Sequence, residues 1–168
     1  MSSTEMSTKE KELRKKELLI INSAGEAEQP FRYSAGRYGS RFLTEMQERK
    51  RFVGVRCPKC AKVYVPPREV CGPCFTKMEE EVEVGPRSTL MTYTIIRFSY
   101  IDPETGDIRP VPFGYGFFKL DGADTLFQHY FPIDDESKIK IGARFEPVWR
   151  EDRQGSVRDI EHFVLIAD

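Results

Sequence analysis

Hydrophobic and polar positions change their spacing twice along the chain. Residues 1–17 are mostly Ser, Thr, Glu, Lys and Arg with little to bury, which favours disorder or a frayed helix. Across residues 38–50, Phe42, Leu43 and Met46 recur at near-helical spacing among charged residues, which predicts a short amphipathic helix. From residue 51 onward, short runs of β-branched and aromatic residues between turn residues predict a chain built mainly of strands.

The first strands lie close together in the sequence. Residues 51–56 alternate enough to predict a strand, and residues 63–65 predict a second one. Pro66 and Pro67 end the second strand because neither residue can donate to a strand ladder. The acidic stretch 79–83 follows, and after it Gly85-Pro86 predicts a joint into a second module.

Five further strands are predicted in the second half of the chain, at residues 89–98, 113–120, 125–131, 144–149 and 159–166. Asp121-Gly122 is a strong hairpin signal between two of them, and Gln154-Gly155 marks another turn. Polar loops, residues 102–109 among them, separate the strands. Five short strands with polar hairpin tips suit a small closed or partly open barrel such as the OB-fold.

The cysteines of the chain form two Cys-x-x-Cys pairs, Cys57 with Cys60 and Cys71 with Cys74, and there are no others. Two such pairs can give one Zn²⁺ four thiolate ligands in tetrahedral geometry. Four protein ligands leave no open coordination position, so the predicted zinc is structural. Iron in a rubredoxin-like site uses the same ligands and stays an alternative.

Other roles for these cysteines fit the sequence less well. Disulfides would suit an oxidising compartment, whereas the N-terminus carries no evident secretory signal. A redox Cys-x-x-Cys is expected as a single motif at the start of a helix in a βαβ setting, and neither pair has that context. Four cations beside the ligands either offset the charge of a four-thiolate centre or are merely solvated; they are Arg56, Lys59, Lys62 and Lys77.

The predicted fold class is mainly β with an N-terminal helical segment, in which a zinc ribbon is followed by a five-stranded OB-fold barrel. Residues 1–50 are expected to form an N-terminal extension and the amphipathic helix, residues 51–85 the zinc ribbon, and residues 86–168 the OB-fold domain. A chain of 168 residues with 39% hydrophobic residues has enough material for one ordinary core and one small metal-stabilised module.

The charge balance narrows the possible partners. A net charge of −1 and a pI near 6.2 argue against a dedicated nucleic-acid binder, which normally carries a basic face. No apolar run approaches the roughly 18 residues that would span a bilayer, and residues 18–21 form only a short apolar cluster. We therefore expect a cytoplasmic protein that does not enter a membrane.

No catalytic residue is predicted. His129 shares strand parity with Phe127, and His162 shares it with Ile160, so both histidines are expected to be packed strand residues. The acidic residues 134–136 lie in a polar loop and are expected to form a solvated turn. Because the thiols are assigned to metal, the chain offers no evident nucleophile for acyl transfer.

Several segments resemble the DUF35 family. They are Arg56-Cys57-Pro58-Lys59-Cys60, Val65-Pro66-Pro67-Arg68, Cys71-Gly72-Pro73-Cys74, Thr92-Tyr93-Thr94 and Ile141-Gly142-Ala143-Arg144. The resemblance covers about residues 35–168, and its motifs are specific in order and spacing. The chain departs from the family pattern at Ala61, where many members have Gly, and at Ala143, where Met is commoner.

The resemblance implies a rubredoxin-like zinc ribbon and a C-terminal OB-fold in a protein that works with a thiolase-superfamily enzyme. Members are commonly the non-catalytic subunit, so we expect a hetero-oligomer with a thiolase-like catalytic subunit and an acyl-CoA ester as the substrate of the complex. Within the family, the layout is similar to that of subunits serving the thiolysis of benzoylsuccinyl-CoA in anaerobic toluene degradation.

Three functions remain open from the sequence. In the first, the chain is an accessory subunit that helps to position the CoA ester and to exclude water. Aromatic residues within the segment 113–116 would then meet the acyl chain or adenine, and Arg97, Arg109 or Lys119 a CoA phosphate. The alternative for these residues is that the rings fill the barrel and the cations are solvated.

The second function is binding of single-stranded nucleic acid, because OB-folds and zinc ribbons both recur in that role. Tyr93, Phe98, Tyr100 and Tyr115 would then stack on bases. The third is a stand-alone acyl-CoA enzyme or carrier, which predicts turnover or CoA affinity in the purified monomer.

Overall fold

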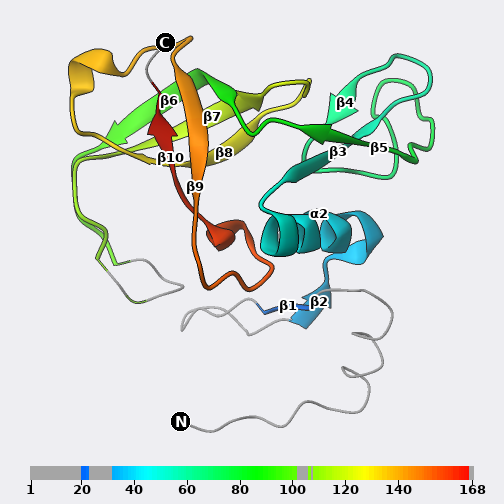
Figure 1. Ribbon diagram of the computed structural model, residues 1–168, viewed down its shortest axis with the longest axis horizontal. Helices are drawn as coiled ribbons and strands as arrows, with labels where there is room; N and C mark the ends of the chain where they lie inside the picture. Colours follow the sequence, from blue (N-terminus) through cyan, green and yellow to red (C-terminus); the bar gives the residue numbers. More distant parts are fainter. Residues whose placement is uncertain (1–19, 23–31, 102–105, 107, 167–168) are drawn as a thin grey trace, which may run out of the picture.

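The computed structural model describes residues 20–22, 32–101, 106 and 108–166 (Figure 1). Its elements are β1 (Ile20–Asn22), β2 (Arg32–Ser34), α2 (Gly36–Arg49), β3 (Phe52–Arg56), β4 (Val63–Tyr64), β5 (Glu80–Val84), β6 (Ser88–Ile96), β7 (Phe113–Leu120), β8 (Phe127–Pro132), β9 (Arg144–Trp149) and β10 (Ile160–Leu165), with the 3-10 turns η1 (Glu136–Lys138) and η2 (Val157–Asp159). The predicted mainly β chain with one helical segment is confirmed. The predicted disorder or helix of residues 1–17 lies outside the described residues.

Helix α2 is amphipathic, as the spacing of its apolar residues predicted. Phe42, Leu43 and Met46 are buried and belong to the largest core cluster of the protein. The helix ends at Lys50, whose left-handed backbone (φ 54°) lets its N–H donate to the Met46 carbonyl at 3.2 Å. Within the described part of the chain, no helix combines the length and the apolar character needed to cross a membrane.

A three-stranded antiparallel sheet in the order β4-β3-β5 forms the first β unit. No strand was predicted in the acidic stretch 79–83, yet residues 80–84 form β5 and pair with the whole of β3. Val84 is buried and Val82 is half-buried, whereas the three glutamates of the strand stay exposed. Each of these glutamates forms an ion pair with an arginine, which offsets their negative charge in the strand. The pairs are Glu80 with Arg56, Glu81 with Arg41, and Glu83 with Arg51.

The second β unit is a five-stranded antiparallel sheet in the order β10-β9-β6-β7-β8. Strand β10 also lies against β8, so the sheet curls into a partly closed barrel (Figure 1). Each of the five predicted strands is present, with ends within two residues of the prediction. The Asp121-Gly122 turn joins β7 to β8, as the hairpin signal predicted, with Gly122 at φ +85°. The predicted five-stranded barrel is therefore confirmed.

Aromatic rings fill the interior of the barrel. Phe118, Phe131 and Phe163 are fully or almost fully buried, and the rings of Phe118 and Phe163 stack with centroids 4.4 Å apart. A Cβ atom on Gly114 would lie 2.1 Å from the ring of Phe131. Strand β7 therefore needs glycine at this inward position, because the ring crosses the strand directly against its backbone.

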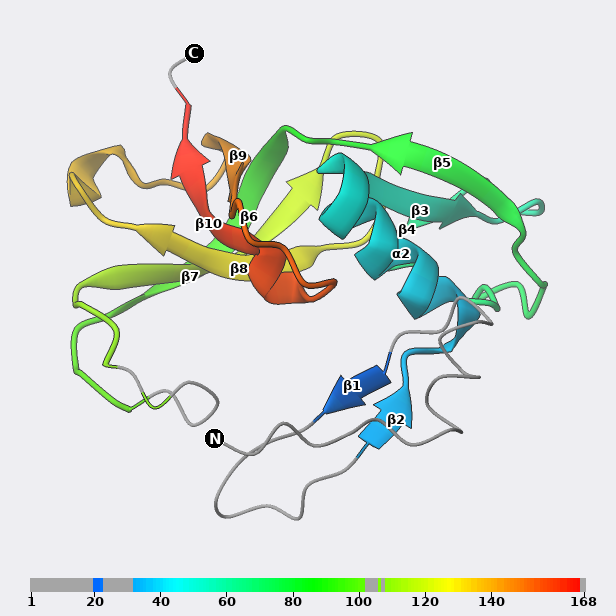
Figure 2. The same ribbon diagram turned by 60° about the horizontal axis from the view of Figure 1, so that its bottom comes forward.

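Helix α2 connects the two β units. It lies beside β3 on one side and near η2 and the β9–β10 loop on the other (Figure 2). The Arg153 guanidinium donates to the Gln47 carbonyl at 2.6 Å, and the Gln47 amide donates back to the Arg153 carbonyl at 3.2 Å. The helix therefore holds the three-stranded sheet and the barrel in one arrangement.

The segment 141–144, one of those that resemble DUF35, ties the start of β9 to neighbouring strands. The Gly142 N–H donates to the Leu90 carbonyl at 2.8 Å, and the Leu90 N–H donates to the Ala143 carbonyl at 2.9 Å. Arg144 then forms a two-pronged ion pair with Asp121 at the tip of the β7–β8 hairpin. This pair holds the hairpin tip against β9.

A β-bulge in β10 overturns one expectation about the histidines. The strand register shifts between Ile160 and His162, so Phe163 joins Ile160 on the core side and is fully buried. The expected shared parity of His162 with Ile160 was therefore wrong. His162 is half-buried and lies on the face opposite to Phe163.

Candidate metal centre

The two Cys-x-x-Cys segments fold into matching turns. The Ala61 N–H donates to the Cys57 carbonyl at 2.9 Å in the first turn, and the Phe75 N–H donates to the Cys71 carbonyl at 2.8 Å in the second. In each turn the N–H of the first cysteine also donates to the carbonyl five residues ahead, at 2.9 and 3.0 Å. The repeated geometry presents two sulfurs from each turn to one point, as a zinc knuckle requires.

The residue after each cysteine pair has a left-handed backbone. Ala61 has φ +59° and Phe75 has φ +49°. Glycine adopts this conformation most easily, so glycine would be the least strained residue at both positions. The departure at Ala61 adds a Cβ atom at a strained turn and leaves the cysteine positions unchanged.

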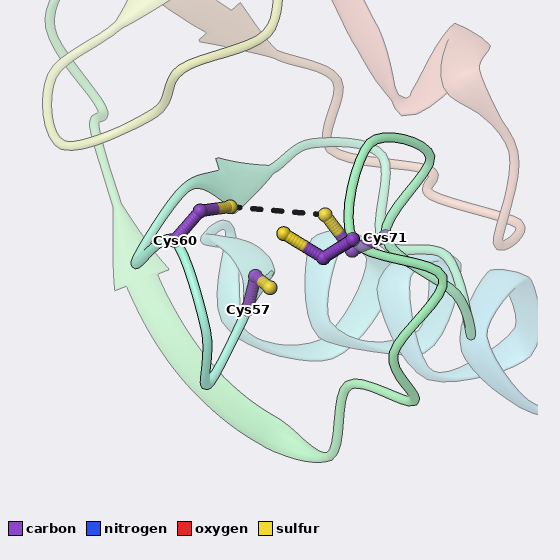
Figure 3. A group of neighbouring side chains, drawn as sticks. Cys57, Cys60 and Cys71 are labelled. Carbon is purple, nitrogen blue, oxygen red and sulfur yellow. Dashed lines mark hydrogen bonds between the residues drawn. The ribbon is translucent and has the colours of Figure 1, made fainter.

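The four sulfurs converge. All four lie within 4.8 Å of one another, and the Cys60 and Cys71 sulfurs are 3.8 Å apart. In Figure 3 the labelled cysteines from the two turns point their sulfurs toward one shared space. A Zn–S bond of about 2.3 Å in a regular tetrahedron implies sulfurs about 3.8 Å apart. The cysteines are free thiols in the structure, so the disulfide alternative is not supported.

The centre has a buried side and an exposed side. Cys57 and Cys71, the first cysteine of each turn, are fully buried, whereas Cys60 is exposed and Cys74 is half-buried. The buried cysteines share a small core of their own with three other buried residues, Val55, Tyr64 and Met78. Because all four cysteines of the chain face this one site, the arrangement can hold a single metal ion with a closed ligand set.

A tyrosine hydroxyl contacts one of the sulfurs and lowers the pKa of that thiol. The Tyr64 hydroxyl lies 3.2 Å from the Cys71 sulfur, and both residues are buried. Its hydrogen bond to the thiolate lowers the pKa of Cys71 to about 6 even though burial opposes the charge. The same hydrogen bond, together with burial, raises the pKa of Tyr64 to about 12. Sequence reasoning did not single out Tyr64, although its position between the two cysteine pairs was a usable signal.

The pKa of Cys74 shifts in the opposite direction, upward. The neighbouring sulfur of Cys60 and burial raise the pKa of Cys74 to about 12. Thiolates this close repel one another, so all four can carry charge together only if a cation lies among them. The donor set therefore fits a divalent ion that prefers thiolate ligands.

The cations that the sequence placed beside the ligands divide into two groups. Arg56 pairs with Glu80 at 3.0 Å and Lys77 pairs with Glu79 at 2.7 Å, so the acidic residues around β5 take up their charge. Lys59 and Lys62 are exposed. Another cation, Arg68, lies with its guanidinium 4.3 Å from the centre of the Tyr64 ring.

The aromatic segment 113–116 is split by the alternation of β7. Gly114 and Gly116 face the interior, against Phe131. Tyr115 is half-buried on the outer face, where its ring lies 4.9 Å from that of Tyr130. Phe113 is also on the outer face but is only 5% exposed, because the loop before β7 covers it.

The three cations proposed for a CoA phosphate lie in different settings. Arg97 is held by both carboxylate oxygens of Glu136 at 2.7 Å. Arg109 lies over the Tyr130 ring, 3.9 Å from its centre. Lys119 is exposed on β7. The structure thus brings Arg109 together with aromatic side chains, and it does not bring Arg97 there.

The residues proposed for base stacking also lie in different environments. Tyr93 faces inward, where its hydroxyl donates to the Ile139 carbonyl at 3.0 Å and its ring packs on Phe131. Phe98 is 70% exposed, and Tyr100 is half-buried beside it with ring centroids 6.4 Å apart. Stacking by Tyr93 is therefore excluded by its orientation.

His129 is a packed strand residue, as its parity predicted. It is 8% exposed, and its ring is parallel to that of Phe127. Its ring nitrogens lie 3.4 and 3.3 Å from the carbonyl oxygens of Tyr130 and Val157. Burial lowers the pKa of His129 to about 4, so the imidazole is neutral at pH 7.

The acidic residues 134–136 form the solvated turn that the sequence predicted. The Asp135 carboxylate accepts from the Ser137 N–H at 3.0 Å and caps η1, while Glu136 binds Arg97. The hydrogen bonds from Ser137 lower the pKa of Asp135. Asp135 and Glu136 are therefore engaged in local structure.

Family models match both β units. The rubredoxin-like zinc ribbon domain of ChsH2 matches residues 48–79, and the C-terminal OB-fold domain of ChsH2 matches residues 81–150. Together the two matches span well over half of the chain. The fold and the site thus define a protein in which a four-cysteine zinc ribbon is joined to an OB-fold barrel.

Three known proteins resemble this chain at low sequence identity. A DUF35 domain-containing scaffold protein of Methanocaldococcus jannaschii is 28% identical over 106 residues, which are 62% of this chain and 72% of that protein. A DUF35 protein of unknown function from Sulfolobus solfataricus has the same fold, with TM-score 0.56, 21% identity, and coverage of 79% of this chain and 87% of the other. The Ltp2-ChsH2(DUF35) aldolase gives TM-score 0.52, 19% identity, and coverage of 74% and 91%. The chain belongs to the DUF35 family.

Proposed function

We propose that this chain is a non-catalytic, zinc-binding subunit that docks on a thiolase-superfamily catalytic subunit and helps to hold its CoA-ester substrate. The observation that carries the proposal is the convergence of all four cysteines on one centre, which leaves the chain no free thiol to accept an acyl group. The structure of an aldolase formed by Ltp2 and the DUF35 protein ChsH2 supports a catalytic partner for this chain as well.

The ion of the centre is proposed to be zinc, with Cys57, Cys60, Cys71 and Cys74 as ligands. When bound, zinc would supply cross-linking rather than chemistry, because four thiolates leave it no open position. That cross-link would stabilise the three-stranded sheet. The sheet is in turn attached to the barrel, because hydrogen bonds join the β4 region to the β7–β8 hairpin. We retain 1–50, 51–85 and 86–168 as the proposed division into extension, ribbon and barrel.

The proposed contact with the CoA ester lies on the outer face of the barrel. We call this the aromatic face and define it as Tyr100, Phe113, Tyr115 and Tyr130, with Arg109 over Tyr130. Phe113 is buried, but Tyr100, Tyr115 and Tyr130 are only half-buried. Half-exposed rings can stack on adenine, and the guanidinium over Tyr130 can neutralise a phosphate. The strands β7 and β8 are the second and third of the barrel, which is the face that OB-folds use for ligands.

The proposed substrate of the complex is benzoylsuccinyl-CoA, cleaved by thiolysis in anaerobic toluene degradation. This choice rests on the resemblance of the chain's layout to subunits that serve that reaction. It is tested by offering the purified complex benzoylsuccinyl-CoA and acetoacetyl-CoA with free CoA and measuring which ester is cleaved. Cleavage of acetoacetyl-CoA alone would refute this substrate while leaving the subunit role intact.

The subunit role is tested by purifying the tagged chain from its native cell under gentle conditions. We expect a thiolase-like protein in stoichiometric amount, identified by mass, and about one zinc per chain in the same sample. A chain that elutes alone at every salt concentration, or only with nucleic acid, would refute the role.

The contact with CoA is tested on the complex with two matched arginine variants. Arg109→Gln should raise the KM for the CoA ester because it removes the guanidinium over Tyr130. Arg97→Gln is the control, since Arg97 is held by Glu136. Equal KM values for the two variants would remove the aromatic face from the proposal.

A second function has one observation in its favour. The aromatic face also has the composition that lets OB-folds stack single-stranded nucleic acid, although the net charge of −1 is unfavourable. Fluorescence anisotropy with a labelled single-stranded oligonucleotide at increasing salt would detect such binding. Salt-dependent binding that Tyr115→Ala abolishes would support it, and its absence at low salt would refute it.

A further inference from the structure

We propose that the Tyr64 hydroxyl is a positioning group of the metal centre, which holds the buried Cys71 thiolate by a hydrogen bond and slows the loss of the metal. The observation behind this proposal is the 3.2 Å contact between the Tyr64 oxygen and the Cys71 sulfur. This inference rests on the proposed zinc, and it adds a residue that the four-cysteine ligand set does not include.

The surroundings of Tyr64 make this contact matter. Its side chain is 5% exposed and belongs to the small core that also contains Cys57, Cys71 and Met78. A hydroxyl buried in such a core normally needs a hydrogen-bond partner, because leaving it without one costs free energy. The Cys71 sulfur fills that need.

The direction of the hydrogen bond follows from the metal. A metal-bound cysteine has lost its proton, so its sulfur can only accept. Tyr64 must then be the donor, and the bond is made to a charged acceptor, which is stronger than a bond between neutral groups. The hydroxyl thereby takes up part of the negative charge that four thiolates place around one divalent ion.

Arg68 supports the orientation of the tyrosine ring. Its guanidinium carbon lies 4.3 Å from the ring centre, in the geometry of a cation–π contact. Arg68 ends the Val65-Pro66-Pro67-Arg68 segment, which runs from β4 toward the second cysteine turn. The segment therefore holds a cation over the face of the ring whose hydroxyl contacts Cys71.

The position of Cys71 in the centre explains why one extra donor is useful there. Cys60 is exposed and can be hydrated by solvent, whereas Cys71 is fully buried and cannot. A buried thiolate gains more from a protein donor, since no water replaces it. Groups that hydrogen-bond to metal ligands typically change metal affinity by about 10-fold to 100-fold when they are removed.

The test uses the full zinc-loaded chain and a matched pair of Tyr→Phe variants. Tyr64→Phe keeps the ring and removes only the hydroxyl. Tyr38→Phe is the control, because the Tyr38 ring packs on the same small core and its hydroxyl donates at 2.7 Å to the Met78 carbonyl rather than to a ligand. Zinc transfer to an excess of a coloured chelator is followed at neutral pH, after circular dichroism has verified that both variants are folded.

We expect Tyr64→Phe to release zinc about 10-fold faster than the unmodified chain, and Tyr38→Phe to release it at close to the unmodified rate. In the cobalt-substituted chain, the thiolate-to-cobalt charge-transfer band should move to lower energy in Tyr64→Phe and stay in place in Tyr38→Phe. Unchanged release and an unchanged band in Tyr64→Phe would overturn the inference. So would equal acceleration in both variants with no change in the band, because that result would mean a general loss of core stability.

The zinc content of the unmodified chain is measured first, because it separates this inference from the proposed function. A purified chain that binds no zinc or cobalt overturns both the proposed metal and the role of Tyr64. A chain that binds zinc tightly, with no effect of Tyr64→Phe, overturns the role of Tyr64 alone.

Discussion

Asp124 and Val63 exchange two hydrogen bonds across 61 positions of the sequence. The Val63 N–H donates to the Asp124 carboxylate at 2.9 Å, and the Asp124 N–H donates to the Val63 carbonyl at 2.9 Å. Val63 belongs to the ribbon strand β4, and Asp124 follows the tip of the β7–β8 hairpin of the barrel. The Thr125 hydroxyl continues this exchange, because it accepts from the Val65 N–H and donates to the Val65 carbonyl. The backbone of the metal-binding unit is thereby joined to two polar residues of the barrel hairpin.

Replacing Asp124 should weaken the junction. Asp124→Ala removes the carboxylate acceptor of the Val63 N–H, which is expected to lower the free energy of unfolding by about 1–2 kcal/mol. Urea unfolding of the zinc-loaded chain measures the change. Asp124→Asn keeps an oxygen acceptor and serves as the control, with a smaller loss. Equal losses in the two variants would contradict the assigned role of the hydrogen bond.

Replacing Cys71 should remove the metal and unfold the ribbon together. Cys71→Ser removes one thiolate from the centre, so we expect loss of zinc, unfolding of the three-stranded sheet, and a weaker complex with the catalytic subunit. Zinc content, circular dichroism and co-purification measure these three effects. Treatment of the unmodified chain with a strong chelator should reproduce them. A folded, metal-free Cys71→Ser chain in an intact complex would contradict a structural role for the metal.

Glu45 is a buried carboxylate within α2. It is fully buried and forms ion pairs with three arginines, Arg41, Arg49 and Arg51. Burial alone would raise its pKa, but the hydrogen bond from Arg51 and the three positive charges outweigh burial and lower it. The carboxylate is therefore charged at neutral pH and compensates the arginines that join α2 to β3 and β5.

Glu45→Gln should consequently be strongly destabilising. We expect a loss of about 2–3 kcal/mol, which is below the cost of breaking a fully buried pair because the arginines remain partly solvated. Denaturant unfolding at pH 7 measures it. Glu48→Gln, at an exposed position of the same helix, should change stability by less than about 0.5 kcal/mol. Similar effects of the two substitutions would contradict this account.

His129 should make the stability of the protein depend on pH. In the unfolded chain its pKa is near the ordinary 6.5, whereas burial lowers the pKa in the folded chain to about 4. Between these values the unfolded chain binds a proton that the folded chain does not. Stability is therefore complete above about pH 6.5 and falls as the pH drops toward 4, by at most about 1.4 kcal/mol per pH unit.

Two histidine variants separate the effect of His129 protonation on stability from the effect of carboxylate protonation. His129→Phe should remove most of the loss of stability between pH 7 and pH 5, and His162→Gln should retain it, because His162 is only half-buried. Urea midpoints at the two pH values measure the difference. If His129→Phe lost as much stability as the unmodified chain over this interval, burial of His129 would not be the cause.

The left-handed backbone at Ala61 offers a stabilising substitution. Ala61→Gly removes a Cβ atom at φ +59°, and relief of that strain should add about 0.5–1 kcal/mol to stability. The melting temperature of the zinc-loaded chain measures the gain. Ala123→Gly, at a buried position without positive φ, is the control and should destabilise the protein. Destabilisation by Ala61→Gly as well would show that the strain is not relieved by glycine.

Strand positions were predictable because alternation and turn residues are local signals. The barrel strands matched the prediction within two residues, while β5 was missed because three of its five residues are glutamates. The pairing of β5 became evident only once arginines on α2, β3 and the turn between them lay opposite those glutamates. The side of His162 was mispredicted for a related reason, since a single bulge reverses strand parity and leaves no clear signal in the sequence.

The sequence by itself determined the elements of this protein and the candidate ligands of its metal, because both depend on short-range chemistry. The x-x spacing within each cysteine pair and the turn after it are enough to present two sulfurs together. Only the tertiary structure decided which groups surround them. Three contacts depend on how separate elements pack. They are the hydrogen bond of Tyr64 to Cys71, the exchange between Val63 and Asp124, and the placement of Arg109 rather than Arg97 on the aromatic face. No local pattern specifies such contacts, because they join residues that come together only when the two β units share one core.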